Sequence, residues 1–135
     1  MANGLYKPYK SAAMSGGANT DLLTGDVKAV LVDAADYTVD LDNHDFLADI
    51  AAGARVATSG NLASKTFASN AFDAADFSFT TVSGDPSEAL VYYIDTGVEA
   101  TSRLVLYVDT ATGLPITPNG GNIDVTHNAS GIFLT

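Results

Sequence analysis

The sequence contains no cysteine, which excludes disulfide bonds, thiolate metal sites and a cysteine nucleophile. Basic residues are also scarce: six lysines and arginines stand against 16 aspartates and glutamates, so the formal net charge is −10. A chain with this charge repels phosphate backbones and anionic lipid headgroups, so we expect neither nucleic acid nor a membrane as a partner. No apolar run reaches the length that spans a bilayer.

Catalytic motifs are missing as well. The sequence has no serine nucleophile elbow, no phosphate-binding loop and no dinucleotide fingerprint. Most aspartates stand in turn positions, where the carboxylate accepts hydrogen bonds from the nearby backbone. Examples are Asp33, Asp36, Asp73, Asp76, Asp85 and Asp109. We therefore expect a protein that is not an enzyme and that carries no cofactor.

Hydrophobic residues make up 47% of the 135 positions and charged residues only 16%. This balance is typical of a chain that folds around a core, and the length predicts one domain. The first ten residues, MANGLYKPYK, lack the apolar centre and the cleavage pattern of a secretory signal. The chain is expected to fold in the cytoplasm in which it is made.

Short strand patterns recur about every ten residues, with turn signals between them. The two clearest lie at 88–94 and 102–108, and the loop between them is a plausible hairpin connection. The others lie at 27–32, 55–58, 62–67, 77–82, 123–127 and 132–134. This spacing predicts an all-β, mainly antiparallel single domain, either a β-sandwich or barrel-like.

The first 20 residues are rich in glycine, alanine, serine and asparagine, which predicts an extended N-terminal arm ahead of a β-rich domain over 21–135. Pro8 and the neighbouring tyrosines favour an extended backbone there. Two readings of the tyrosines stay open: they anchor the arm on a partner, or they pack on their own domain. The candidate partner-binding residues are Tyr6, Lys7, Tyr9 and Lys10.

Residues 42–50 predict the one short helix of the domain, capped by Asp42 or Asn43. Its apolar face would consist of Phe46, Leu47 and Ile50. Alternating oxygen ligands in this region can hold calcium, and the weak candidates are Asp40, Asp42 and Asp45. Acidic residues in a first helical turn also complement the helix dipole without any ion. We expect capping here and no metal.

Two histidines and two adjacent tyrosines remain as candidates for a site. His44 and His127 could bind a transition metal together with a carboxylate, but a histidine at a strand end such as His127 is more often structural. Tyr92 and Tyr93 point to opposite faces of their strand, so one is expected in the core and one at the surface. The exposed one would serve as a contact for a partner or a sugar, or simply in cross-strand packing.

Four segments carry a resemblance to a known group of proteins: 22–33 (LLTGDVKAVLVD), 35–38 (ADYT), 44–50 (HDFLADI) and 109–121 (DTATGLPITPNGG). The chain resembles small structural proteins encoded in the virion-assembly gene clusters of tailed bacteriophages, from about residue 5 to the C-terminus. The resemblance implies a capsid decoration (cement) protein that binds and stabilises the assembled head. It implies the major capsid protein, other virion proteins or a second copy as partners, a place on the capsid surface after synthesis in the host bacterial cytoplasm, and no catalytic residues.

Two alternatives accompany this hypothesis. The protein could be a tail, collar or head-fibre component of the same kind of virion. It could instead be a carbohydrate-binding or adhesion module, which would need exposed aromatic side chains on one face of a sheet. Calcium bound within residues 40–49 would strengthen that last reading.

Overall fold

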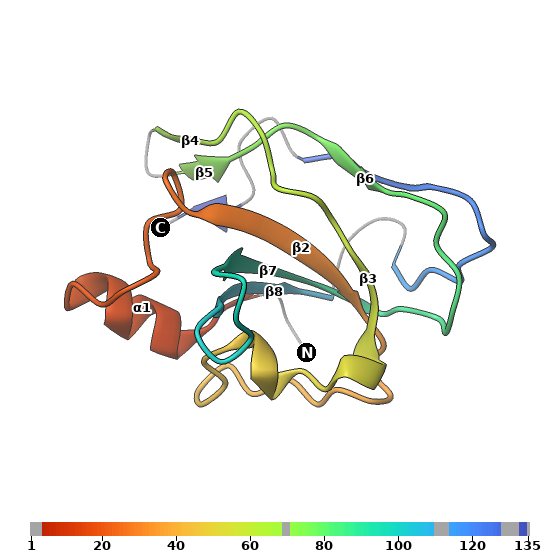
Figure 1. Ribbon diagram of the computed structural model, residues 1–135, viewed down its shortest axis with the longest axis horizontal. Coiled ribbons are helices and arrows are strands. Elements are labelled where there is room, and N and C mark those ends of the chain that lie inside the picture. Colours follow the sequence, from red (N-terminus) through yellow and green to blue (C-terminus); the bar gives the residue numbers. More distant parts are fainter. Residues whose placement is uncertain (1–3, 69–70, 110–113, 128–132, 135) are drawn as a thin grey trace.

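The structure is a computed structural model that describes residues 4–68, 71–109, 114–127 and 133–134 (Figure 1). Its largest element is a five-stranded antiparallel sheet with the strand order β1-β8-β7-β2-β3. These strands are β1 (Gly4–Leu5), β2 (Asp26–Val32), β3 (Arg55–Thr58), β7 (Ala89–Asp95) and β8 (Arg103–Val108). The sheet is open, because β1 and β3 form two separate edges.

The central strands β2 and β7 hold the core. They pair along their full length, from Asp26 opposite Asp95 to Val32 opposite Ala89. Both strands carry near-continuous apolar runs, and nearly all of these side chains are buried. Complete burial of one such valine or leucine contributes about 1.5 to 3 kcal/mol. The strands that were predicted here are confirmed, each within about one residue of its expected ends.

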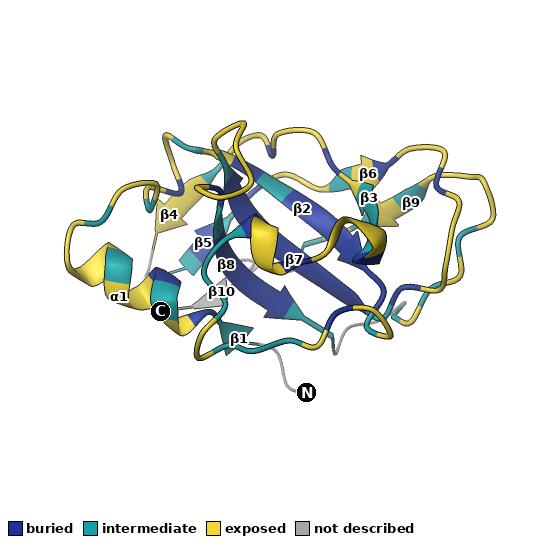
Figure 2. Ribbon diagram, turned by 60° about the horizontal axis from the view of Figure 1, so that its bottom comes forward, coloured by how far each residue is buried: buried dark blue, intermediate teal, exposed yellow. Residues whose placement is uncertain are grey.

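Two small sheets lie on one side of the large one (Figure 1). Their strands are β4 (Thr66–Ala68), β5 (Ala71–Asp73) and β10 (Phe133–Leu134) in one, and β6 (Phe77–Phe79) and β9 (Ile123–Val125) in the other. The Phe77 ring of β6 stands edge-on to the Tyr92 ring of β7, with 6.4 Å between the ring centroids. Phe72 of β5 and Phe79 of β6 are buried, so aromatic side chains join these layers into one core. Figure 2 shows the buried residues of β2 and β7 in dark blue.

The prediction of a mainly antiparallel all-β fold with one short helix is confirmed, and its finer part, a sandwich or barrel, stays a prediction. The position of the helix was wrong. The one α-helix of the described residues is α1 (Lys7–Met14), not 42–50. Pro8 sits at the start of α1, where its missing N–H costs no hydrogen bond and its fixed φ angle suits the helix.

Residues 42–50 are held by β8 and cannot form a helix of their own. Phe46 makes an antiparallel bridge with Arg103, and the Leu47 N–H donates to the Ser102 carbonyl at 2.8 Å. Backbone groups that pair with a strand are not free for the i to i−4 bonds of a helix. A single 3₁₀ turn, Leu47–Asp49, remains, and a second one, Ala52–Ala54, leads into β3.

The prediction of an extended N-terminal arm over 1–20 was also wrong for residues 4–14. Gly4 and Leu5 add a strand to the large sheet opposite Tyr107 and Leu106 of β8. The Tyr6 N–H continues this pairing by donating to the Val105 carbonyl at 2.9 Å. The segment therefore belongs to the same folded unit as the rest, and the boundary at residue 20 does not separate an arm from the core. Residues 1–3 lie outside the described residues.

Candidate functional site

A chain of hydrogen bonds links the buried Tyr6 and Tyr37 to the half-buried His44. The Tyr6 and Tyr37 hydroxyl oxygens are 2.9 Å apart, and the Tyr37 hydroxyl lies 2.9 Å from His44 Nδ1. The Asp40 N–H also points at this nitrogen, at 3.3 Å, so Nδ1 acts as an acceptor. The Tyr37 hydroxyl then donates to His44, and the Tyr6 hydroxyl donates to Tyr37. His44 thus orients the Tyr37 hydroxyl, which in turn binds Tyr6 of the N-terminal segment.

Burial sets the acidity of this chain. Loss of hydration raises the pKa of Tyr37 to about 12 and raises the pKa of Tyr6 well above its ordinary value. Neither phenol ionises near neutral pH, so neither can act as a base there. The arrangement serves to hold the fold together.

The four predicted partner-binding residues separate into two groups. Tyr6 is fully buried, and Tyr9 is nearly so, with its hydroxyl donating to the Thr20 carbonyl at 3.2 Å. The prediction that these two tyrosines anchor the chain on a partner was wrong. The alternative, that they pack on their own domain, is confirmed. Lys7 forms an exposed ion pair with Asp42 at 2.6 Å. Lys10 is exposed and forms no ion pair with any described residue.

The weak calcium candidates are not gathered around one point, and each has its own partner. Asp40 accepts hydrogen bonds from the Asn43 side chain and from the Asp42 and Asn43 N–H groups, which hold its pKa below the ordinary value. The Asp42 carboxylate pairs with Lys7, and Asp45 pairs with Arg103 at 2.7 Å. Local turn bonds and ion pairs thus use the oxygens that an ion would need.

Calcium should therefore act identically on the wild type and on Asp42→Asn. We expect the difference in Tm between about 1 mM calcium and EDTA to be the same for both proteins, because Asp42 is not a calcium ligand in this structure. A calcium site with a dissociation constant at or below about 1 mM would raise the Tm at this calcium concentration. Thermal unfolding followed by circular dichroism measures it. A calcium-dependent rise in Tm that disappears in Asp42→Asn would contradict the structure.

A second acidic group brings together carboxylates that the sequence does not place side by side. One oxygen each of Asp33, Asp36 and Asp85 lies within 4.8 Å of the others. Asp33 is buried and accepts a hydrogen bond from the Ala35 N–H, whereas the other two are exposed. The sequence analysis read all three as turn residues, and that role is visible for Asp33. No signal in the sequence shows that the distant Asp85 turn meets the other two.

The second histidine also has a structural environment. His127 Nδ1 lies 3.0 Å from the Ala74 carbonyl, so it carries the proton, and Nε2 accepts from the Tyr92 hydroxyl at 2.9 Å. His44 and His127 take part in separate hydrogen-bond chains and do not form one metal site. Tyr92 and Tyr93 are both buried, so the expectation that one is exposed was wrong.

Arg103 joins three segments that are far apart in the sequence. Its guanidinium donates to Asp45 Oδ1 at 2.7 Å and to the Ala18 carbonyl at 3.2 Å. The same group stands 4.9 Å from the centre of the Phe46 ring, a cation–π distance. Because only 11% of the Arg103 side chain is exposed, water screens this ion pair less than a surface pair.

Replacing Arg103 by methionine should lower the free energy of unfolding by about 1 to 3 kcal/mol, since it leaves Asp45 and the Ala18 carbonyl without their donor. Urea unfolding measures the change. Arg103→Lys keeps the charge and should restore part of the loss. Equal stability of Arg103→Met and wild type would mean that the pair contributes nothing.

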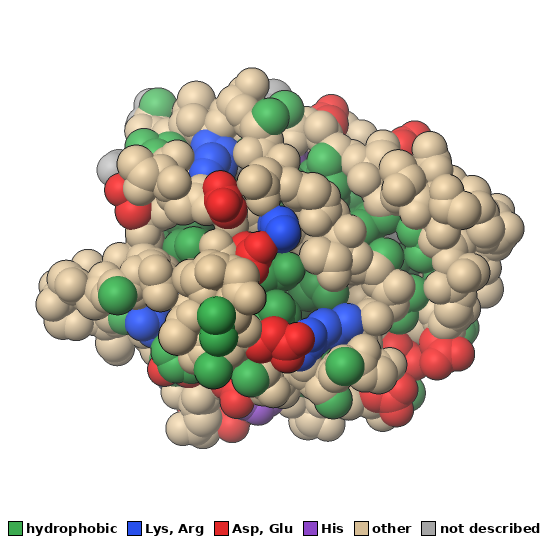
Figure 3. All heavy atoms as spheres, viewed as in Figure 1, with side chains coloured by type: hydrophobic (Ala, Val, Ile, Leu, Met, Phe, Trp, Pro, Cys, Tyr) green, Lys and Arg blue, Asp and Glu red, His purple; other side chains and the backbone are tan. Residues whose placement is uncertain are grey.

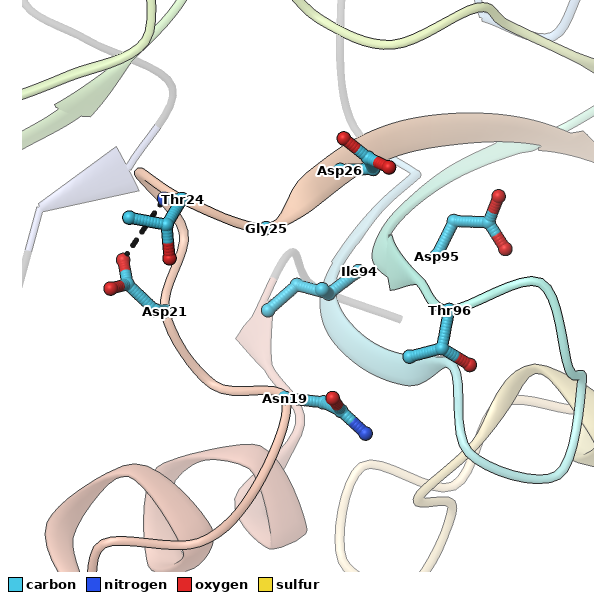
Figure 4. A pocket seen from close by; sticks show the side chains of 8 residues that line it. All are labelled: Asn19, Asp21, Thr24, Gly25, Asp26, Ile94, Asp95 and Thr96. Carbon is cyan, nitrogen blue, oxygen red and sulfur yellow. Dashed lines mark hydrogen bonds between the residues drawn. The ribbon is translucent and has the colours of Figure 1, made fainter.

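A pocket lies where β2 begins and β7 ends (Figure 4). It has a volume of about 400 Å³. Its lining comes from two segments, which are Asn19, Asp21, Thr24, Gly25 and Asp26 on one side and Ile94, Asp95 and Thr96 on the other. Figure 4 shows the Ile94 side chain between the two segments, and this buried residue supplies the apolar part of the wall.

Local contacts shape both sides of this pocket. Asp21 Oδ1 accepts the N–H groups of Leu23 and Thr24, which lowers the pKa of Asp21 and fixes the turn before β2. Gly25 is required for close packing, because a Cβ atom there would come within 2.8 Å of the Ile94 side chain. Lys28 lies 2.7 Å from Asp95 and lowers the pKa of that carboxyl group. The sequence analysis missed this pocket, although Asp26 and Asp95 flank two predicted strands.

Comparison with known proteins does not identify a family for this chain. Among the described residues, no helix is long and apolar enough to cross a membrane. The chain matches no protein-family model, and no curated protein matches it significantly.

Proposed function

We propose that this protein is a non-enzymatic structural protein of a tailed-bacteriophage virion, and that it decorates the assembled capsid as a cement protein. The observation that carries the proposal is the position, in the fold, of the segments on which the resemblance rests. Residues 22–33 contain β2, one of the two central strands, and 44–50 hold the edge of β8 through Phe46 and Leu47. Both segments serve as framework, as expected for a group of proteins that share a scaffold and no catalytic centre.

The distribution of charge supports the same proposal. Four of the six basic side chains are paired with an acidic one, whereas the chain has 16 acidic groups. Figure 3 shows a group of acidic side chains at the lower right with no basic side chain among them. An acidic surface keeps a protein soluble at high copy number before assembly, and repeated sites on a shell turn weak contacts into high avidity.

A carbohydrate-binding module gains no support from the described residues. Tyr92 and Tyr93, the aromatic candidates on the paired strands, are buried. Asp40, Asp42 and Asp45 are engaged in other bonds. The rival that remains is another virion part, such as a tail, collar or head-fibre component.

The test is a cryo-EM map of the purified particle that carries this protein, searched for the five-stranded sheet. Density repeated over the outer capsid lattice is the expected result. Density only on the tail, collar or fibre would overturn decoration and favour the rival. Absence of the protein from the particle, checked by mass spectrometry of its proteins, would overturn both.

A further inference from the structure

The two-stranded sheet of β6 and β9 continues at one end into hydrogen bonds between two loops (Figure 2). The Val82 N–H donates to the Gly121 carbonyl at 2.9 Å, and the Gly120 N–H donates to the Val82 carbonyl at 2.7 Å. The Thr81 N–H donates to Asn122 Oδ1 at 3.0 Å. These bonds close the end of the sheet, and we call the five residues that form them the clasp.

The clasp contains the glycine of an Asn-Gly pair. Asn119 stands directly before Gly120, and both residues are exposed to water. Asparagine is a chemically labile residue, and glycine has no side chain to hinder an attack by its own backbone nitrogen. In such a pair the glycine nitrogen can attack the amide carbon of the asparagine side chain. The local sequence alone therefore indicates a position that loses its side-chain amide.

The closed clasp engages both reacting groups. The Gly120 nitrogen must lose its proton before it can attack, and the bond to the Val82 carbonyl stabilises the N–H form. Asn119 Oδ1 accepts the Gly121 N–H at 2.9 Å, which holds the side chain in one orientation. The Val82 side chain is buried and fixes the clasp to the core. In the closed clasp the attack is therefore disfavoured.

The clasp is also a place where local opening costs little. Thr81 has a φ angle of 52°, a left-handed conformation that is unfavourable for a β-branched residue. All clasp residues except Val82 are exposed, and a two-stranded sheet has few contacts at its end. Regions with these properties open without unfolding of the whole domain.

We propose that Asn119 is a site of covalent modification and that the clasp controls its rate. When the clasp opens, the Gly120 nitrogen gives up its proton and bonds to Asn119 Cγ. The bond from Cγ to the side-chain amino group breaks, and this group leaves with a proton as ammonia. Water then opens the succinimide ring at either of its carbonyl groups, which yields aspartate or isoaspartate.

Isoaspartate would keep the clasp open. Its backbone runs through the side-chain carbon atoms, so the chain between Asn119 and Gly120 becomes longer by one atom. The Gly120 N–H then no longer stands in register with the Val82 carbonyl, and the opening becomes permanent. This inference is independent of the proposed function, since it concerns only the chemistry of the folded chain.

The test follows the modification of Asn119 in the full-length protein at mildly alkaline pH, in buffer and in urea. Peptide mapping by mass spectrometry separates Asn119 from Asn3, the other asparagine that precedes a glycine. We expect modification at least about tenfold slower in the folded protein than in urea, because only the few molecules with an open clasp react. This comparison needs no variant.

Asn122→Ala tests the clasp itself. It removes the acceptor of the Thr81 N–H and should speed the modification of Asn119 in buffer about two- to tenfold, the effect of one hydrogen bond. In urea it should change nothing. Asn61→Ala is the matched control, because Asn61 is an exposed asparagine in the loop between β3 and β4 and should leave the rate as in wild type. Circular dichroism checks that both variants are folded.

Hydrogen exchange of the Gly120 N–H, followed by NMR, gives a second readout. We expect this amide to be protected in wild type and to exchange faster in Asn122→Ala by the same factor as the modification. Equal rates of modification in buffer and in urea would overturn the proposal. So would an Asn119 that reacts at the wild-type rate in folded Asn122→Ala, or a Gly120 N–H that exchanges as fast as in the unfolded chain.

Discussion

Replacing Tyr6 by alanine should lower the free energy of unfolding by about 3 to 5 kcal/mol, the cost typical of removing a buried aromatic side chain. The ring is fully buried, and its hydroxyl donates to Tyr37. The same substitution would have almost no effect in a loose arm. Urea unfolding followed by circular dichroism measures the loss against a total stability of only about 5 to 15 kcal/mol for a typical domain.

Two controls separate the parts of this effect. Tyr6→Phe keeps the ring and removes only the hydroxyl, so it should cost about 1 to 2 kcal/mol. Met14→Ala alters the other end of the N-terminal helix, where the side chain is 83% exposed, and should change stability by less than about 0.5 kcal/mol. If Tyr6→Ala and Met14→Ala were equally stable, the N-terminal segment would not be part of the core.

The protein should unfold cooperatively between about pH 10 and pH 12. Burial raises the pKa of each of its six tyrosines, and it brings Tyr37, Tyr93 and Tyr107 to about 12. In the unfolded chain these phenols ionise near pH 10. Above that pH the unfolded state binds fewer protons than the native state, so stability falls as pH rises. Each tyrosine contributes a slope of about 1.4 kcal/mol per pH unit.

The absorbance of tyrosinate and the circular dichroism signal of the sheet report the two events separately. We expect both to change together, because the phenols ionise only when the core opens. Tyr93→Phe removes one titrating group and should make the fall of stability with pH less steep by about 1.4 kcal/mol per pH unit. Ionisation of all tyrosines near pH 10 with the sheet intact would contradict this burial.

The central strands were predictable because such long hydrophobic runs must be buried in the core of the protein. Leu90–Ile94 in β7 and Leu104–Tyr107 in β8 are almost entirely apolar, and both are buried. The strand expected at 62–67 is found only at its end, in β4. Leu62 fills the core from a loop, where its N–H donates to the Val27 carbonyl. An apolar residue thus predicts burial more reliably than it predicts a strand.

The local structures that the sequence misassigned depend on distant partners. Residues 42–50 have a helical pattern, but pairing with Ser102 and Arg103 overrides it. The pocket was not predictable for the same reason, since Asp26 meets Asp95 only through the register of β2 on β7. The register depends on the contacts along both strands together, so the residues around Asp26 alone do not show which residue lies opposite it.

The pairing of β1 with β8 has a consequence for synthesis. Tyr6 is translated before Val105, whose carbonyl its N–H binds, by roughly 5 to 20 s at ordinary rates of synthesis. Until then β1 has no strand to pair with, and Tyr6 and Tyr9 have no complete core to pack into. The segment that holds β1 is therefore exposed to proteases and chaperones during this interval, and β8 completes the sheet that β1 joins.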